Sequence, residues 1–413
     1  MASSLSLFGC TRWVSPRFCL PSAKSLFYPL ATICARSAVY AALLPLWLCF
    51  SSISQAALED RSVHPAAQIN PARPFLQLDI TALGARLLSV GEHGRILFSD
   101  DQGLSWMQAK VPVSVLLTAI DGATEAAAWA VGHDGILLKT LDRGETWQLA
   151  LDGAAINQLV ADYYQVLLAR AESDSGSSEE MLDELRFRAE DALIAQQDKM
   201  LRTLLDVAFI DADRGYVLGA YGLILATQDG GQSWQPMIEE LGNLDGLHLN
   251  AITFTDTAIL IAGEAGALFR RQFGDDAWEV LDSPYQGSFF GAQALGGDRL
   301  LVFGLRGHAF ISDDGGDSWE SLSLPLNRTL TGVAQLSDGT LVFVGSFGAA
   351  LVKPPSQPFR MQRLPIPAPS MSIVAVTDDR VVLVGLAGAQ TLVITSVSPP
   401  GLSAKPLDAQ QGN

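Results

Sequence analysis

Residues 131–147 read VGHDGILLKTLDRGETW and hold, in one unit, the two motifs that decide the fold of this chain. The first motif is a short hydrophobic run that ends in a glycine, two variable residues and a second glycine, followed by another hydrophobic run. The second motif is Thr-x-Asp-x-Gly-x-x-Trp, which ends at Trp147. Two runs of strand length around a glycine-containing turn predict a pair of antiparallel strands.

The glycine pair occurs seven times along the chain, at intervals of roughly 40 residues, as expected for a repeat architecture. One interval, between Gly132 and Gly219, is about twice as long as the others and must hold an insertion. A repeat of this length made of short strands and turns is typical of a β-propeller, in which each unit is one four-stranded blade. The sequence therefore predicts an all-β, seven-bladed propeller over residues 76–396. The pairs are Gly91/Gly94, Gly132/Gly135, Gly219/Gly222, Gly263/Gly266, Gly304/Gly307, Gly345/Gly348 and Gly385/Gly388.

The second motif is an Asp-box, which recurs in units one, two, three and five. Its hydroxyl and carboxylate can bond to the turn's own backbone, its glycine can supply a positive φ, and its tryptophan can bury a large ring. Because these carboxylates shape the turn, we expect a structural role and no catalytic one. The box residues are Ser99, Asp101, Gly103, Trp106, Thr140, Asp142, Gly144, Trp147, Thr227, Asp229, Gly231, Trp234, Ser312, Asp314, Gly316 and Trp319.

The remaining units depart from this pattern. Unit four keeps only a remnant that ends at Trp278, and unit six has a proline-rich stretch before Phe359, which we expect to be an edge connection. Unit seven shows strands only from Ser372 to about Thr395. A closed propeller has to join its ends, so the N-terminal segment 57–75 is a candidate for the missing fourth strand. Residues 397–413 are expected to form a flexible tail.

The doubled interval, at about residues 154–203, predicts a helical hairpin inserted between blades 2 and 3. Two alternatives remain for its role. Either the apolar stripe of the hairpin simply packs on the blades, or the hairpin is a docking element for a partner. The residues that recur at helical spacing are Leu159, Tyr163 and Val166 in the first arm and Leu182, Leu185, Ala189 and Leu193 in the second.

Residues 1–56 contain no Asp or Glu and hold an apolar run from about Ala38 to Phe50 before Ser54-Gln55-Ala56. They predict an export signal with an extended leader, cleaved near Ala56, because the run is short for a membrane span. We expect a periplasmic location, with the thylakoid lumen as the alternative because the leader is long, basic and Ser-rich. The mature chain would lack thiols, since the four cysteines all lie in the leader: Cys10, Cys19, Cys34 and Cys49.

The chain is acidic, with 27 basic and 44 acidic residues and a formal net charge of −17. Nucleic acid is a poor partner for such a surface, because nucleic-acid binding depends on Lys and Arg that neutralise phosphates. A positively charged protein surface or a neutral ligand is more compatible. No glycine-rich phosphate cradle and no Ser-His-Asp order stands out, so we predict no catalytic residues and no cofactor.

The variable residues between paired glycines are candidates for binding. In a blade of antiparallel strands A to D, the glycine turn joins B to C and the Asp-box joins C to D, so the two turns lie on opposite faces. Connections from strand D to the next strand A, including the helical insert, share the face of the glycine turns. Loops on one face of a rigid scaffold usually carry binding, and Tyr, Phe and Arg are enriched in protein interfaces. The candidates are Glu92, His93, His133, Asp134, Tyr221, Tyr285, Phe289, Phe290, Arg306 and Phe347.

Two of these sets have alternative interpretations. His93 and His133 occupy equivalent places in adjacent blades, but two histidines are one ligand short of a typical zinc site, and we predict no metal. Phe289 and Phe290 are equally compatible with the first residues of a core strand.

The repeated VGxxG motif, the hydrophobic run after it and the SxDxGxxW boxes, in an exported protein, resemble the photosystem II stability and assembly factor family of seven-bladed propellers. Its relatives in non-photosynthetic bacteria are the most similar branch. The resemblance covers about residues 76–395 and rests on Val90 to Gly94, Val131 to Gly135, Leu218 to Gly222 and the four Asp-boxes.

This resemblance implies a non-enzymatic factor that binds a membrane protein complex, or an envelope transporter, and assists its assembly, stability or operation. Such a factor would be peripheral to the membrane, and we expect a monomer. The family's photosynthetic members use a patch of arginines on the propeller, for which Arg270, Arg271 and Arg306 are scattered candidates here.

An enzyme or a glycan-binding propeller is the alternative class, because Asp-boxes also occur in sialidases and other glycosidases. A sialidase would need an arginine triad, and the Arg-Ile-Pro signature that usually introduces the first arginine is missing from this sequence. Another glycosidase would need two opposed carboxylates in a cleft. Asp134 and Glu264 qualify for that role only by their position in the repeat.

Overall fold

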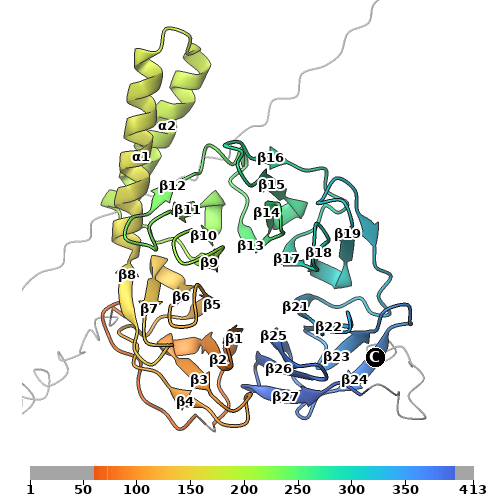
Figure 1. The fold of residues 1–413 in the computed structure, drawn as a ribbon. Coiled ribbons are helices and arrows are strands. Elements are labelled where there is room, and N and C mark those ends of the chain that lie inside the picture. Colours follow the sequence, from red (N-terminus) through yellow and green to blue (C-terminus); the bar gives the residue numbers. More distant parts are fainter. Residues whose placement is uncertain (1–59, 72, 396–413) are drawn as a thin grey trace, which may run out of the picture. The chain divides into compact units, whose positions relative to one another are not determined.

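The structure is a computed structural model that describes residues 60–71 and 73–395. The predicted leader with its cleavage site and cysteines, and the tail at 397–413, lie outside these residues. Seven antiparallel sheets are arranged in a ring with the first strand of each sheet innermost (Figure 1). The predicted seven-bladed propeller with a helical hairpin between blades 2 and 3 is confirmed.

Blades 1 to 4 are four-stranded sheets, with strands A to D in sequence order. Blade 1 consists of β1 (Gln77–Leu83), β2 (Arg86–Gly91), β3 (Ile96–Ser99) and β4 (Met107–Gln108). Blade 2 consists of β5 (Leu117–Gly122), β6 (Ala128–Gly132), β7 (Leu137–Thr140) and β8 (Gln148–Leu151). Blade 3 consists of β9 (Leu204–Phe209), β10 (Gly215–Gly219), β11 (Ile224–Thr227) and β12 (Gln235–Pro236). Blade 4 consists of β13 (Leu249–Phe254), β14 (Ala258–Gly263), β15 (Leu268–Gln272) and β16 (Glu279–Val280).

Blades 5 and 6 are also four-stranded, whereas blade 7 has three strands among the described residues. Blade 5 consists of β17 (Phe289–Ala294), β18 (Leu300–Gly304), β19 (Ala309–Ser312) and β20 (Glu320–Ser321). Blade 6 consists of β21 (Leu330–Gln335), β22 (Leu341–Gly345), β23 (Ala349–Lys353) and β24 (Arg360–Arg363). Blade 7 consists of β25 (Ser370–Thr377), β26 (Arg380–Gly385) and β27 (Gln390–Val393).

The second strand of each blade explains the unbroken hydrophobic runs in the sequence. In blades 1 to 6 every residue of this strand is buried. A strand covered by neighbouring blades on both faces has no solvent side, so it reads as a continuous apolar run instead of an alternating one. The fold is therefore held by apolar contacts between blades as well as within them.

The paired glycines are required where the chain approaches itself closely. A Cβ atom on Gly91 would lie 2.1 Å from the carbonyl oxygen of Leu76 at the entry to strand A. Gly94 adopts a φ of +68°, and a Cβ atom there would lie 2.0 Å from the Val113 carbonyl oxygen in the connection to the next blade. A side chain at either position would push the glycine turn away from the loop beside it.

The insertion forms two helices, α1 (Gly153–Ser173) and α2 (Glu179–Gln197), which extend outward beside β8 and β12 (Figure 1). The side chains of Asp152 and Ser178 cap their N-termini by accepting bonds from the backbone N–H groups of Ala155 and Met181. The buried face differs from the predicted stripe. Ile156, Val160, Ala161 and Tyr164 are buried, whereas Val166 is 50% exposed.

The ring closes differently from the expectation that segment 57–75 adds a fourth strand to blade 7. The described part of this segment lies along blade 1, where Ala66 N–H donates to the Val111 carbonyl over 3.1 Å and Ser114 N–H donates to the Arg61 carbonyl over 2.8 Å. Blades 7 and 1 meet through side chains instead. Val382 and Val384 of β26 pack with Ile80 and Leu87 of blade 1.

Candidate functional site

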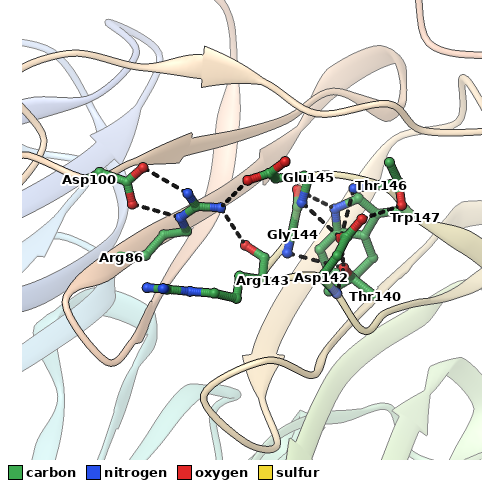
Figure 2. A network of polar contacts seen from close by, with 9 residues as sticks. All are labelled: Arg86, Asp100, Thr140, Asp142, Arg143, Gly144, Glu145, Thr146 and Trp147. Carbon is green, nitrogen blue, oxygen red and sulfur yellow. Dashed lines mark hydrogen bonds and ion pairs between the residues drawn. The ribbon is translucent and has the colours of Figure 1, made fainter.

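The Asp-box of blade 2 shows how this turn uses its polar side chains (Figure 2). The Thr140 hydroxyl donates to Asp142 over 2.8 Å and accepts the Gly144 N–H over 3.1 Å. Asp142 also accepts the backbone N–H of Thr146 over 2.9 Å and its hydroxyl over 2.5 Å. The Trp147 indole N–H donates to the Gly144 carbonyl over 3.1 Å. Every polar group of the motif is thus engaged within the turn.

The other three boxes repeat the hydroxyl and carboxylate contacts with serine at the penultimate position. The indole bond recurs in Trp106, which donates to the Gly103 carbonyl over 3.2 Å, but not in Trp234 or Trp319. Side-chain hydrogen bonds from Ser105, Ser233 and Ser318, joined by bonds from backbone N–H groups, lower the pKa of the box carboxyls to about 2. A carboxylate held in its ionised form by several donors is a poor general acid. The carboxyls concerned are Asp101, Asp229 and Asp314.

A cation from the preceding blade reaches the box of blade 2. The Arg86 guanidinium, on β2, makes two 2.7 Å bonds to the carboxylate of Asp100 in its own blade (Figure 2). Its Nη1 donates across the junction to the Arg143 carbonyl over 3.1 Å and to Glu145 over 3.4 Å. The Arg86 side chain is only 8% exposed, so these contacts fix one blade to the turn of the next.

We call this contact, in which a basic side chain of one blade donates to the fourth residue of the next blade's Asp-box, a latch. Latches also occur at the boxes of blades 1, 3 and 5. Lys139 donates to the Gly230 carbonyl over 2.7 Å, and Arg270 donates to the Gly315 carbonyl over 2.9 Å. Arg380 of blade 7 donates to the Gln102 side chain over 2.9 Å and so helps to close the ring. The four acceptor residues occupy the same box position. Sequence reasoning missed the latches, although a basic residue at the start of strand B or inside strand C is their signal.

The arginines considered for a family-like patch do not gather. Arg270 is buried and pairs with Glu279 and Asp317, both over 2.7 Å. Arg271 contacts the Tyr216 hydroxyl on the box face. Arg306 lies at a glycine turn on the opposite face.

The face of the glycine turns, called the rim below, carries most of the predicted binding residues. His93, Asp134, Tyr221 and Arg306 occupy equivalent places in the glycine turns of blades 1, 2, 3 and 5, each with φ near +60°. Ala265 takes this place in blade 4. Tyr221 is 69% exposed. Glu92 pairs with Arg95 over 3.1 Å, and His133 is exposed.

The two phenylalanines proposed together have different environments. Phe289, the first residue of β17, is fully buried and belongs to the core between blades 4 and 5. Its assignment as a binding residue was wrong, because β17 already begins at Phe289 and this side chain faces the core. Phe290 points the other way and is 41% exposed. Phe347 is partly buried against the core of blades 5 and 6.

Aromatic and imidazole rings join the glycine turns to the loops beside them. Tyr221 meets His248 edge to face with ring centres 4.9 Å apart, and Tyr285 stacks on His308 at 4.2 Å. His248 Nδ1 also lies 3.3 Å from the Glu264 carboxylate. These contacts place turns and interblade loops on one face. Sequence reasoning missed His248 and His308, which lie outside the glycine pairs.

The residues considered for metal binding or hydrolysis are not assembled into a site. Within residues 60–71 and 73–395, no group of three or more His, Cys, Asp or Glu side chains is placed to hold a metal ion. Asp134 and Glu264 belong to blades 2 and 4, with blade 3 between them, and Glu264 pairs with His248.

The helical hairpin is fixed to the same face by tyrosines of α1. The Tyr163 hydroxyl donates to Glu240 over 2.7 Å, and the Tyr164 hydroxyl donates to Glu239 over 2.8 Å, both in the loop between blades 3 and 4. The outer side of α2 stays free, with Phe187 67% exposed and Ile194 45% exposed. No helix among the described residues is long and apolar enough to cross a membrane.

Three aspartates on innermost strands connect successive blades. Asp79, Asp121 and Asp206 accept the backbone N–H of the next blade's first strand, at Ile120, Phe209 and Ile252, over 2.8 to 2.9 Å. Each retains some surface, but protein closely surrounds the carboxyl groups. Burial raises the pKa of Asp79 to about 6 and that of Asp121 to about 7. Burial also raises the pKa of Asp206 well above its usual range.

Comparisons with known proteins agree with this architecture. A family model described as photosynthesis system II assembly factor YCF48 matches residues 192–357. The photosystem II assembly lipoprotein Ycf48 of Synechococcus sp. (strain CC9902) is 32% identical over 94 residues. That match covers 22% of this chain and 28% of the relative's length.

Solved propellers share the fold at low sequence identity. A structure described as YCF48 bound to D1 peptide has a TM-score of 0.55 and 16% identity, covering 81% of this chain and 100% of that one. YCF48 from Cyanidioschyzon merolae has a TM-score of 0.54 and 11% identity, covering 79% and 98%. The WD40 propeller domain of Doa1 has a TM-score of 0.53 and 10% identity, covering 79% and 95%. In its repeats, its matched segment and its fold, the chain is similar to the Ycf48-like β-propellers.

Proposed function

We propose that this protein is an exported, non-enzymatic scaffold that binds a component of a membrane protein complex and assists its assembly, stability or operation. An envelope transporter is one client that fits this role. The observation that carries the proposal is the rim. There, seven variable turns, the loops between blades and a helical hairpin lie on one face, while the aspartate carboxylates of the box motifs are engaged inside their own turns.

The relatives support the same kind of activity. One of them is described as an assembly lipoprotein, and a solved propeller of the family is described as bound to a D1 peptide. The rim offers this chain a comparable surface, with Tyr221 and Leu244 69% and 79% exposed. Exposed aromatic and aliphatic side chains beside charged ones are typical of surfaces that bind proteins.

Affinity capture from a solubilised membrane extract tests the proposal. The mature protein is the bait, and its partners are compared with those of a Tyr221→Ala/Leu244→Ala variant of the rim. A matched variant of the box face, Leu104→Ala/Leu141→Ala, removes two side chains that are 71% and 66% exposed. We expect the rim variant alone to lose a membrane protein. Equal capture by all three baits would contradict the assignment of binding to the rim.

A second variant separates the hairpin from the turns. Phe187→Ala/Ile194→Ala removes the exposed side chains of α2 without touching the buried face of the hairpin. Loss of capture would make the hairpin a docking element, and unchanged capture would leave it a structural support for blades 2 and 3. Hydrolysis of fluorogenic sialosides or β-glucans by the mature protein would contradict the non-enzymatic assignment.

A further inference from the structure

Two of the junctions without a latch precede blades 4 and 6, in which the Asp-box has been lost. Arg271 in blade 4 occupies the position that Thr140 occupies in blade 2. Arg271 pairs with Ile259, and Thr140 pairs with the equivalent residue Ala128. Phe273 and Asp275 then occupy the places of the box aspartate and the box glycine. In blade 6, Lys353 opposite Leu341 occupies the hydroxyl position. In both blades a basic residue thus replaces the residue that organises an intact box.

A pocket lies at each of these altered junctions. The pocket between blades 3 and 4 has a volume of about 270 Å³, and its lining includes Tyr216, Gln228, Arg271, Gln272 and Asp276. The pocket between blades 5 and 6 has a volume of about 310 Å³, and its lining includes Ile311, Lys353 and Pro354. Loss of the box therefore coincides with a hollow at the place where the latch and the turn meet in intact junctions.

The pocket between blades 3 and 4 is lined by polar side chains that do not bond to the rest of the described protein. Within the described part of the chain, the side chains of Gln228, Gln272, Asp275 and Asp276 make no hydrogen bond. The Arg271 guanidinium contacts the Tyr216 hydroxyl and lies 5.6 and 5.1 Å from the ring centres of Tyr216 and Trp278. It has no carboxylate partner among the described residues.

The other pocket is chemically different. The Lys353 ammonium bonds to the Pro354 carbonyl over 3.3 Å and lies 5.8 Å from the centre of the Phe359 ring. Arg299 at its edge pairs with Asp313 over 2.6 Å. The two charged groups of this pocket are therefore engaged, whereas Arg271 in the pocket between blades 3 and 4 has no carboxylate partner among the described residues.

We propose that the pocket between blades 3 and 4 binds one ring of a neutral saccharide. Amide, carboxylate and guanidinium side chains present paired donors and acceptors that match neighbouring hydroxyl groups. Phe273, which is 38% exposed, supplies an apolar ring against which the C–H face of a sugar can pack. Arg214 in the same lining is already paired with Asp211 over 2.8 Å, which leaves Arg271 beside the carboxylates of Asp275 and Asp276. These carboxylates disfavour an anionic sugar, so a neutral one fits best.

The site is independent of the proposed role of the rim. Its residues come from the ends of β11 and β15 and the turns that follow, on the box face. Binding of a sugar here would let the protein hold a glycan and a protein client at the same time. Loss of sugar binding is therefore expected to leave client capture unchanged, and the reverse is expected for rim variants.

Titration calorimetry and saturation-transfer NMR with maltotriose, cellotriose and chitotriose test the proposal on the mature protein. We expect at least one of the three to bind and the Gln228→Ala/Asp276→Ala variant to weaken that binding at least tenfold. Arg271→Lys keeps the charge and removes the forked donor, so it should weaken binding less. Lys353→Ala in the other pocket and Tyr221→Ala on the rim are the controls and should bind as the parent does.

Three results would overturn the proposal. The first is that none of the trisaccharides binds at its solubility limit. The second is that binding persists unchanged in the pocket variants while their circular dichroism spectra match the parent. The third is that an unstructured peptide competes for the same residues and the sugars do not, which would make the pocket a peptide site.

Discussion

Blade 2 carries Asp134 in its glycine turn and Asp142 in its Asp-box, and the two residues have different surroundings. Asp142 in the Asp-box accepts hydrogen bonds from two threonine hydroxyls and from the backbone N–H groups of Glu145 and Thr146. Asp134 in the glycine turn adopts a φ of +60° at the tip and lies beside Gly153, where α1 begins. The same residue type shapes the turn on the box face, whereas on the rim it stands in a turn to which we assign binding.

The altered junctions sharpen this comparison. Where the box and its latch are intact, as between blades 1 and 2, polar groups of the box face bond to one another and to the neighbouring blade. Where the box is lost, as between blades 3 and 4, a pocket with unengaged polar groups takes its place. On the box face, we therefore assign binding to a junction that has lost its Asp-box and latch.

The largest expected effect comes from removing a tryptophan of an intact box. Trp147→Ala should lower the free energy of unfolding by about 3 to 5 kcal/mol, because the ring is 4% exposed and its loss leaves a cavity. Trp106→Ala should cost less, since Trp106 is only partly buried. Urea denaturation followed by circular dichroism measures both. Equal costs would mean that burial does not set the contribution of a box.

The latch is the next test, with an altered junction as its matched control. Arg86→Met should destabilise by about 2 to 3 kcal/mol, because it leaves Asp100 and the Arg143 carbonyl without their charged donor. Arg271→Met at the junction of blades 3 and 4 should cost less than about 1 kcal/mol, because it breaks no ion pair. The same denaturation measurement serves here. A larger loss for Arg271→Met would contradict the distinction between intact and altered junctions.

The inner aspartates give a pH-dependent test of the ring. In the folded state Asp79 keeps its proton up to about pH 6, whereas an unfolded chain releases it near pH 4. The folded state thus binds more protons in this window, so the contribution of Asp79 makes stability fall as pH rises from about 4 to 7. Asp79→Asn removes that contribution and should stabilise the protein by about 1 to 3 kcal/mol at pH 8 relative to its effect at pH 4.

Paired unfolding curves at the two pH values decide this point. The difference between parent and variant isolates Asp79 from the box carboxyls, whose lowered pKa values act below pH 4. A variant that loses more stability at pH 8 than at pH 4 would show that the ionised carboxylate, and not the protonated one, holds blades 1 and 2 together.

The smallest expected change in stability is on the rim. Tyr221→Ala should alter the free energy of unfolding by less than about 0.5 kcal/mol, because the side chain is 69% exposed and its main ring contact is with His248. Thermal unfolding measures this change. A loss of several kcal/mol would place Tyr221 with the box residues as part of the scaffold.

The sequence predicts the repetitive parts of the molecule and fails where contacts are long-range. The glycine pairs and boxes predict the number of blades and which turns lie on which face, because their chemistry is local to each turn. The latches and the contact of His248 were missed, since Arg86 and Arg143, or Tyr221 and His248, come together only after the blades have packed. Phe289 was misassigned because a residue at a strand boundary reads the same whether its side chain faces the core or the solvent.

Site-specific photocrosslinking is the most direct test of the claim that the rim binds the client. A photoreactive amino acid is placed at Tyr221 or Leu244 on the rim, or at Leu104 or Leu141 on the box face, in cells that make the protein. All four side chains are exposed, so each probe is accessible without disturbing the core. The account predicts crosslinks to a membrane protein from the two rim positions only. Crosslinks from the box-face positions, with none from the rim, would contradict it.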